Sequence, residues 1–340
     1  MKFVRKTIKI ILISAAFFVV AYFLLSYRVT PDNFTYGMSF SKFRTDELQL
    51  PYEETFIAIL DDLGVRHFRF SAHWPNTEAE NNQFNFKELD FQIGEAQKRG
   101  ADVVFAVGRR LPRWPECHDP DWVLGLDEKD RNAEVLEYIE TVVNRYKKHD
   151  NIVYWQIENE PFLSLFAYEQ CGDLDEDFLQ EEINLVKKLD PNTPILVTDS
   201  GNLGVWYKPW RLGDAFGTSL YRYFWNPDIG TFKSRLPASF YKIKHNLTKV
   251  FFGKKDSMII ELSAEPWLVQ PVVNTPIETQ IERMDVDKMK EIVSFAKKTG
   301  FAKQYMWGAE WWYWMKKAGH NEYWEYGKTI FDTGEMDVNM

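Results

Sequence analysis

The sequence predicts a (β/α)₈ TIM barrel preceded by an N-terminal transmembrane helix. Within residues 31–340, eight short runs rich in β-branched and aromatic residues alternate with amphipathic stretches of helical periodicity. Polar and aromatic residues gather where these runs end, whereas the runs themselves are mostly apolar. A barrel places its functional residues at the C-terminal ends of its strands, so both observations agree with one fold.

The eight expected strands lie at residues 34–40, 65–71, 102–107, 152–157, 194–198, 215–221, 257–260 and 303–307. The expected helices keep apolar residues on one face and lie at residues 52–63, 86–98, 131–148, 177–189, 239–250 and 286–298. Gly64, Gly100 and Gly300 follow three of these helices, where a C-terminal cap is expected. The connection at residues 199–214 shows no regular pattern.

A doubly wound open sheet is the alternative fold for alternating strands and helices. The nucleotide-binding version of that fold carries a glycine-rich turn after its first strand. Here the first strand holds only Gly37, between Tyr36 and Met38. The barrel is therefore the preferred prediction.

The N-terminal 30 residues differ from the rest of the chain. Lys2, Arg5, Lys6 and Lys9 precede an apolar run at residues 10–27, which is typical of a signal anchor with a cytoplasmic N-terminus. We expect residues 1–30 to be this basic flank and transmembrane helix, and residues 31–340 to be one exported domain, periplasmic or extracellular. A cleaved signal peptide is the alternative, and it implies export as well.

The charge of the chain argues against nucleic acid as a partner. Five of the 41 basic residues and none of the 50 acidic residues precede Pro31, so residues 31–340 carry a formal net charge of −14. An acidic domain repels phosphate backbones and other acidic polymers. The composition does not indicate an oligomeric state.

The two cysteines, Cys117 and Cys171, are too few and too far apart for a zinc site. In an exported domain they can form a single disulfide. Two buried free thiols are the equal alternative.

Two glutamates follow expected strands, Glu160 after the fourth and Glu261 after the seventh. Both would face the open mouth of a barrel from rigid backbone. Glycoside hydrolysis needs such a pair, because one carboxyl group must stay protonated and the other ionised. Glu158 is a weaker rival of Glu160. Glu265 is a rival of Glu261, although the pair Ile259-Ile260 suggests that the strand ends at Glu261.

The ordered set of strand-end residues resembles the clan A glycoside hydrolases, the retaining (β/α)₈ group that includes family 5 cellulases and mannanases. Asn159-Glu160-Pro161 resembles the fourth-strand motif of the clan, and Ile259-Ile260-Glu261 resembles its seventh-strand motif. Arg69, Tyr221 and Trp307 match its second-, sixth- and eighth-strand residues. Family 5 often carries histidines where this chain has Gly108-Arg109-Arg110 and Ser219, so the substrate is less certain than the chemistry.

The resemblance implies a role for each matched residue. Glu160 would be the general acid and base, Glu261 the nucleophile, and Asn159 the partner of the sugar 2-hydroxyl. Arg69 and Tyr221 would hold Glu261, although Arg69 can also be a structural ion pair. Retention of configuration would place the two carboxyl groups about 5–5.5 Å apart.

Many indoles lie between Trp307 and Trp324. Flat rings suit sugar faces, so we expect Trp307, Trp311 and, after the second strand, Trp74 to bind substrate. Packing beneath a long loop and contact with the membrane interface are the alternatives. The loop with Arg109, Arg110, Arg113 and Trp114 is either a substrate-binding loop or a solvated one.

The sequence as a whole predicts a membrane-anchored retaining glycoside hydrolase of β-linked sugars that requires no metal or organic cofactor. A non-catalytic carbohydrate-binding barrel is the rival from another class. A transglycosidase that uses the same residues is the second rival. The sugar, the linkage and the choice between internal and terminal cleavage are not predicted.

Overall fold

The computed structural model describes residues 7, 31–163, 167–172 and 175–332. The expected transmembrane helix at residues 10–27 lies outside these residues, so the structure does not test it. Within the described ranges, no helix combines the length and the apolar character needed to cross a membrane.

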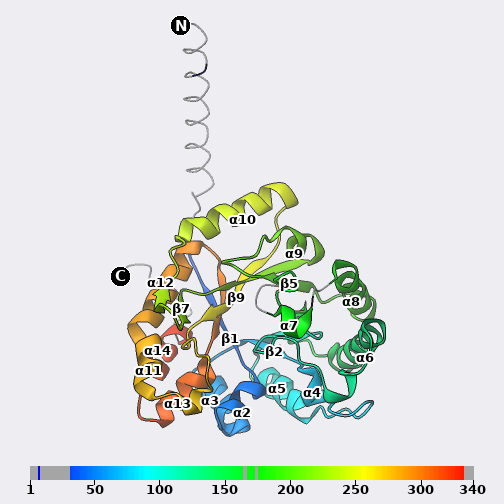
Figure 1. Cartoon of the computed structure of the whole chain (residues 1–340), viewed down its shortest axis with the longest axis horizontal. Coiled ribbons are helices and arrows are strands. Elements are labelled where there is room, and N and C mark those ends of the chain that lie inside the picture. The colour runs from blue at the N-terminus through cyan, green and yellow to red at the C-terminus, as the bar shows by residue number, and fades with distance from the viewer. Residues whose placement is uncertain (1–6, 8–30, 164–166, 173–174, 333–340) are drawn as a thin grey trace.

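Eight parallel strands close into a barrel, which confirms the predicted fold (Figure 1). Around the barrel their order is β1-β10-β9-β6-β5-β4-β3-β2. Each barrel strand pairs with the barrel strands before and after it in the sequence, and β1 pairs with β10 to close the barrel. Strands β7 and β8 form a separate hairpin. The barrel strands are β1 (Thr35–Ser39), β2 (His67–Ser71), β3 (Asp102–Val107), β4 (Ile152–Ile157), β5 (Ile195–Asp199), β6 (Ala215–Leu220), β9 (Ser257–Ser263) and β10 (Lys303–Trp307).

Helices surround the barrel, with α6 and α8 along one side and α11, α12, α13 and α14 along the other (Figure 1). All six predicted helices are present, with ends shifted by a few residues. The described helices are α2 (Lys42–Glu47), α3 (Tyr52–Asp61), α4 (Trp74–Thr77), α5 (Lys87–Lys98), α6 (Glu128–Tyr146), α7 (Tyr168–Cys171), α8 (Glu176–Leu189), α9 (Tyr207–Leu212), α10 (Ala238–Phe252), α11 (Ile277–Arg283), α12 (Val286–Thr299), α13 (Ala309–Lys317) and α14 (Glu322–Phe331).

Local sequence signals explain where several helices begin and end. Asp127, Asp175 and Asp285 precede α6, α8 and α12, and each side chain accepts a hydrogen bond from a backbone N–H of the first helical turn. Gly300 ends α12 with a φ of +79°, a left-handed conformation that costs glycine little.

The hydrophobic core has two parts. The larger part lies between the barrel and its helices. A smaller cluster comes from strand residues alone, as expected of side chains that point into the barrel, and it consists of Val104, Leu196, Ala215, Met258, Ile260 and Tyr305. Toward the C-terminal ends of the strands, polar side chains replace the apolar side chains of this cluster.

The structure contradicts one strand prediction and adds a hairpin that was not predicted. The seventh barrel strand, β9, continues past Ile260 to Ser263, so Glu261 lies within the strand and not at its end. The chain after β6 forms the hairpin of β7 (Tyr223–Asn226) and β8 (Gly230–Lys233), which the sequence analysis did not predict.

Strand β9 contains one more residue than either neighbour between Ile259 and Leu262. Such a bulge bends the strand and changes the direction of a side chain, and bulges are frequent beside active sites. The bulge explains how Ile260 can pack in the barrel while Glu261, the next residue, also faces the barrel mouth.

Candidate active site

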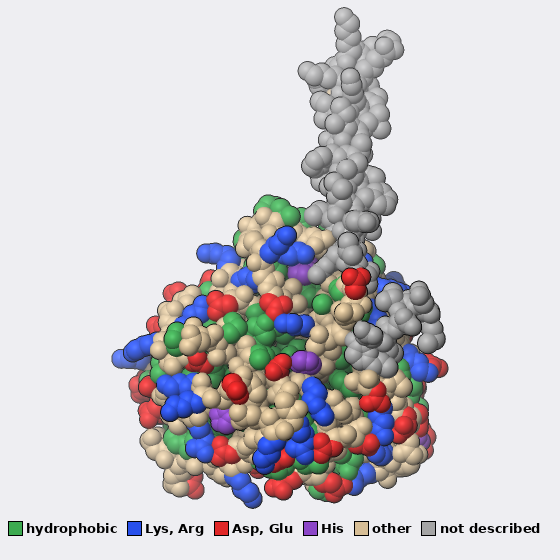
Figure 2. All heavy atoms as spheres, turned by 180° about the vertical axis from the view of Figure 1, so that it is seen from behind, with side chains coloured by type: hydrophobic (Ala, Val, Ile, Leu, Met, Phe, Trp, Pro, Cys, Tyr) green, Lys and Arg blue, Asp and Glu red, His purple; other side chains and the backbone are tan. Residues whose placement is uncertain are grey.

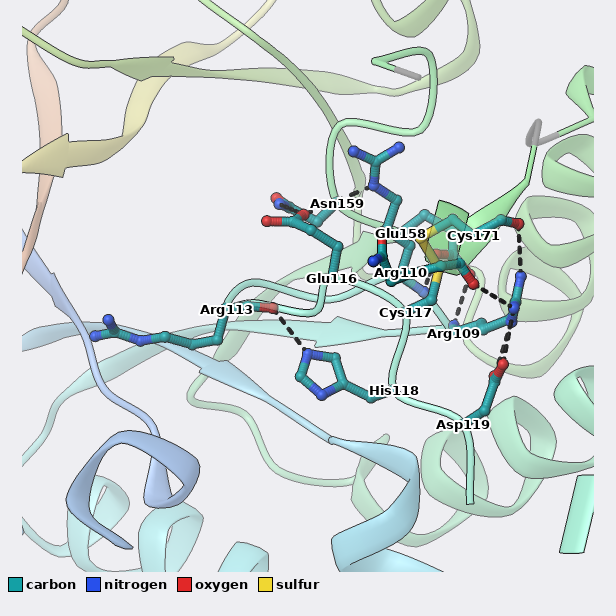
Figure 3. The surroundings of a disulfide bond; sticks show 11 residues. Arg109, Arg110, Arg113, Glu116, Cys117, His118, Asp119, Glu158, Asn159 and Cys171 are labelled. Carbon is teal, nitrogen blue, oxygen red and sulfur yellow. Dashed lines mark hydrogen bonds and ion pairs between the residues drawn. A yellow bond between two sulfur atoms is a disulfide. The ribbon is translucent and has the colours of Figure 1, made fainter. Parts of the chain in front are cut away.

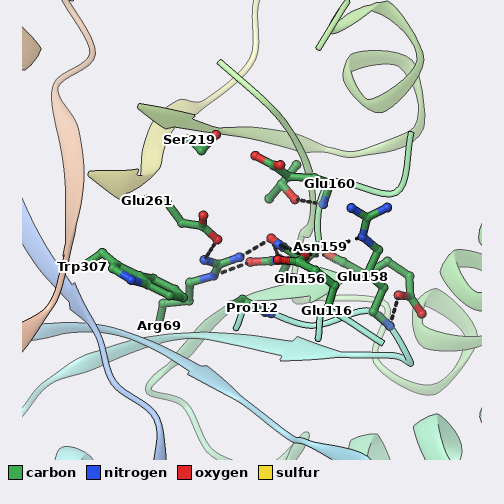
Figure 4. Close-up of polar contacts among 12 residues, drawn as sticks. Arg69, Pro112, Glu116, Gln156, Glu158, Asn159, Glu160, Ser219, Glu261 and Trp307 are labelled. Atoms are coloured by element: carbon green, nitrogen blue, oxygen red, sulfur yellow. Dashed lines mark hydrogen bonds and ion pairs between the residues drawn. The ribbon is translucent and has the colours of Figure 1, made fainter. Parts of the chain in front are cut away.

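The C-terminal ends of five strands bring the predicted site residues together. Arg69 comes from β2, Glu160 follows β4, Tyr221 follows β6, Glu261 lies in β9 and Trp307 ends β10. In Figure 4 the carboxyl group of Glu160 points toward Glu261 across the barrel mouth.

Glu261 is buried, with 4% of its surface exposed, and both of its oxygens accept hydrogen bonds. Arg69 donates from Nη1 to Oε1 over 2.5 Å, and the hydroxyl of Tyr221 donates to Oε2 over 3.0 Å. A charge-assisted hydrogen bond from a guanidinium stabilises a carboxylate. These two hydrogen bonds hold the carboxyl group of Glu261 in one orientation.

Arg69 is itself fixed by two further contacts (Figure 4). It donates from Nε to Gln156 over 2.8 Å and from Nη2 to the Oδ1 of Asn159 over 2.7 Å. One buried arginine thus connects β2, β4 and β9. Because its guanidinium is planar and rigid, it sets the positions of Glu261 and Asn159 relative to each other.

Glu160 has the opposite environment. Burial and the nearby charge of Glu261 raise the pKa of Glu160 to about 8. Its Oε1 has no hydrogen-bond partner among the described residues, and Ser219 contacts the carboxyl group. The raised pKa favours the protonated form of Glu160, whose carboxyl group points toward Glu261 (Figure 4).

The backbone around Glu160 adopts an uncommon conformation. Glu158 and Glu160 have φ values of +57° and +45°, in the left-handed region that most side chains avoid. The backbone N–H of Glu160 donates to Thr198 Oγ1 over 2.9 Å, which holds this turn against β5. Strained residues of this kind persist where the surrounding structure fixes them, and they cluster at functional sites.

A third carboxyl group, that of Glu116, lies beside the pair and was missed by the sequence analysis. The Nδ2 of Asn159 donates to Glu116 Oε2 over 3.4 Å. Burial raises the pKa of Glu116 to about 7, partly offset by Arg110. Glu116 sits in a long loop after β3, and no local pattern in the sequence indicates that this loop crosses the barrel mouth.

A disulfide between Cys117 and Cys171 fixes this loop, which decides between the two alternatives for the cysteines (Figure 3). Arg109 supports it by binding the carboxylate of Asp119 and the backbone oxygen of Cys171. The link joins the loop after β3 to the segment after β4, so the two segments that carry Glu116 and Glu160 are tied together.

Glu158, the weaker rival of Glu160, lies under the same loop. Its two oxygens accept hydrogen bonds from the backbone N–H groups of Arg109 and Arg110 (Figure 3). Burial raises the pKa of both Glu158 and the adjacent Glu182. Glu158 therefore supports the loop from below and does not face Glu261.

Glu265, the rival of Glu261, is bound by two arginines and an indole. It accepts hydrogen bonds from Arg44, from Arg113 over 2.5 Å and from the Nε1 of Trp307 over 2.8 Å. Burial opposes its ionisation, but Arg113 and Arg44 outweigh that effect and lower its pKa to about 2. Both carboxylate oxygens of Glu265 therefore accept hydrogen bonds within this cluster.

Arg113 also covers Trp307, one of the three tryptophans that were expected to bind substrate. Its guanidinium lies 3.9 Å from the centre of the Trp307 ring. The cavity lined by Arg69, Arg113, Trp307 and Glu310 has a volume of about 10 Å³, which is room for one water molecule.

Trp74 and Trp311 do not reach the pair. Both side chains are fully buried. The indole of Trp74 donates to Glu78, and that of Trp311 donates to Gln280. Packing beneath the rim, the alternative reading, therefore describes both residues. In the described part of the chain, no group of three or more His, Cys, Asp and Glu residues could hold a metal ion.

Comparisons with known proteins agree with this geometry. Residues 32–231 match the family model "Cellulase (glycosyl hydrolase family 5)". An endo-1,4-β-xylanase 3 of Hypocrea jecorina is 26% identical over 161 residues, which are 46% of this chain and 44% of the xylanase. The chain thus spans less than half the length of that curated relative.

Solved structures share the fold at low sequence identity. A family 1 β-glucosidase from Thermotoga maritima is 13% identical with a TM-score of 0.57, covering 90% of this chain and 99% of that one. An endo-β-1,4-xylanase of family 10 from Gloeophyllum trabeum is 17% identical with a TM-score of 0.50, covering 82% of this chain and 85% of that one.

Proposed function

The chain belongs to glycosyl hydrolase family 5, and on that premise we propose that it is a retaining glycoside hydrolase that cleaves β-linked glycosides or polysaccharides. Glu160 is the general acid and base, and Glu261 is the nucleophile. The named activities of the xylanases and of the β-glucosidase, all on β-linked sugars, support the substrate class.

The observation that carries the proposal is the contrast between the two carboxyl groups. Burial and the neighbouring charge of Glu261 raise the pKa of Glu160 to about 8, which favours its protonated form. Arg69 and Tyr221 donate to Glu261, which favours its charged form. Double displacement at a sugar needs an acid and an anion at the same moment, and these two environments supply them.

In the first step, Glu261 attacks the anomeric carbon while the proton of Glu160 moves to the departing oxygen. The glycosidic bond breaks, and a covalent glycosyl-enzyme on Glu261 remains. Asn159, oriented by Arg69, binds the 2-hydroxyl of the reacting sugar. Trp307 is buried beneath Arg113, so a sugar that stacks on this ring has to displace the guanidinium of Arg113 from it.

In the second step, Glu160 is a carboxylate and acts as the general base. It takes a proton from water, the hydroxide oxygen bonds to the anomeric carbon, and Glu261 leaves as a carboxylate. Both residues return to their starting charge states. Two inversions at one carbon give retention of configuration.

The test is hydrolysis of aryl β-glycosides and of β-glucan, β-mannan and β-xylan oligosaccharides by the purified full chain, alongside Glu160→Gln and Glu261→Gln. We expect turnover in the parent and losses of several orders of magnitude in both variants. Turnover that survives in Glu261→Gln and disappears in Glu265→Gln would reassign the nucleophile. Binding without turnover, equal in parent and variants, would favour the carbohydrate-binding barrel. Products longer than the substrate would indicate transglycosylation.

We propose further that the domain is exported and held at the membrane by residues 1–30. The basic and apolar pattern of that segment supports this, as does the Cys117–Cys171 disulfide, because such bonds persist in oxidising compartments. An alkaline phosphatase fused after residue 340 should be active only if the C-terminal side is exported. Release of the uncleaved chain into the soluble fraction would contradict the anchor.

A further inference from the structure

The exposed aromatic residues of the site do not lie where the indole-rich segment predicts them. Trp307, Trp311, Trp312 and Trp324 of that segment are buried. The exposed rings lie instead on the hairpin of β7 and β8 and on the segment that follows β9. Figure 2 shows the molecule from behind, where charged side chains of both signs are mixed with apolar ones.

Four rings form a contiguous cluster that begins at Tyr221, and Tyr221 also lies 6.3 Å from Phe224 between ring centres. Tyr221, whose hydroxyl donates to Glu261 over 3.0 Å, packs edge-on against Trp267, with 5.7 Å between the ring centres. Trp267 lies 5.6 Å from Phe224, and Phe224 stacks on Phe232 at 5.4 Å. We call these four residues the aromatic platform.

The outer rings of the platform are open to solvent. Trp267 is 37% exposed and Phe232 is 39% exposed, while Phe224 is half-buried between them. Phe224 and Phe232 are opposite each other in the hairpin, so their stacking also stabilises it, but Trp267 lies outside the hairpin and extends the apolar surface toward Tyr221. Contiguous exposed apolar groups that join a site usually mark a binding surface.

The geometry points to the aromatic platform as a binding surface for the sugar units of a β-linked glycan beyond the unit that reacts. Pyranose rings have apolar faces that stack on aromatic rings, and the platform is continuous with the site through Tyr221. The glycan chain therefore extends along the hairpin, and the preferred substrates are oligosaccharides or polysaccharides.

This inference rests on the proposed glycosidase activity, and its test separates the two. The purified full chain, Trp267→Ala and Phe232→Ala are assayed on aryl β-glycosides of one sugar and on cello-, manno- and xylohexaose. Phe251→Ala is the matched control, because Phe251 is 72% exposed on α10 and has no contact with the platform among the ring contacts of the described residues.

We expect kcat/KM on the hydrolysed hexasaccharide to fall roughly tenfold more than on the aryl glycoside in each platform variant, mainly through KM. The control should match the parent on both substrates. Equal losses on short and long substrates would mean that the rings only support Tyr221, and would overturn the inference. Unchanged kinetics in both platform variants would overturn it as well.

If the parent hydrolyses none of these substrates, calorimetric titration of the same hexasaccharides decides the question. Binding that weakens roughly tenfold in the platform variants, and not in Phe251→Ala, would support the platform as a glycan-binding surface even though the proposed activity fails. Equal binding by parent and variants, or no binding by the parent, overturns the platform.

Discussion

The hydroxyl of Tyr221 offers the sharpest test of how Glu261 is held. Tyr221→Phe removes one hydrogen bond of 3.0 Å to Oε2 and keeps the ring that packs against Trp267. A hydrogen bond to a charged group contributes about 1.5–3 kcal/mol. If Glu261 is the nucleophile, this cost falls on the attacking anion, and kcat/KM should drop by roughly 10- to 150-fold.

The assay is steady-state hydrolysis of an aryl β-glycoside, with Tyr313→Phe as the matched control. Tyr313 also donates to a carboxylate, Glu54 at 2.6 Å, but it lies on α13 outside the site. The control should retain the kcat/KM of the parent. A Tyr221→Phe variant within twofold of the parent would refute the assigned contact, and an equal loss in Tyr313→Phe would show that the effect is not local.

Three further predictions concern pH and stability. Because the pKa of Glu160 is raised to about 8, kcat/KM should fall above pH 8 as the acid form of Glu160 disappears, and a pH profile tests this. With an aryl leaving group that needs no proton, kcat/KM should not fall in this pH range. The raised pKa of Glu182 means that the folded state binds more protons than the unfolded chain, so its contribution to stability is present at acid pH and is lost as the pH rises above about 4.3. Glu182→Gln should therefore raise the thermal midpoint by at least about 2 °C at pH 8 and by less at pH 5, and a reversed order would contradict the buried acid. Replacing both Cys117 and Cys171 by Ser should lower the free energy of unfolding by about 2–5 kcal/mol in denaturant titrations, and an unchanged midpoint would show that the link is dispensable.

The strand pattern was predictable because local chemistry decides it. The predicted bounds of two strands agree with the structure, namely Asp102–Val107 and Ile152–Ile157. In each, a run of apolar β-forming residues stops at a glycine or at polar residues. Glu160 and Glu261 were predicted as partners because strand ends of a closed parallel barrel share one rim.

The remaining features depend on contacts between distant segments. The position of Glu116 follows from the disulfide to Cys171, 54 residues away from Cys117. The ion pairs of Glu265 come from Arg44 and Arg113, which lie after two other strands. A bulge in β9 could not be inferred from Ile259-Ile260, because the register of both neighbouring strands defines it. Trp74 and Trp311 show that residue type alone does not distinguish a buried indole from an exposed one.

The disulfide also bears on when the site is assembled during the life of the chain. In a reducing cytosol, Cys117 and Cys171 remain thiols. The loop with Arg113 and Glu116 then has no covalent bond to the segment after β4. The barrel and its carboxylate pair do not depend on that tie, but the wall of the mouth does. If the domain is exported, as proposed, oxidation of these two cysteines after export would complete the wall of the barrel mouth that the loop after β3 forms.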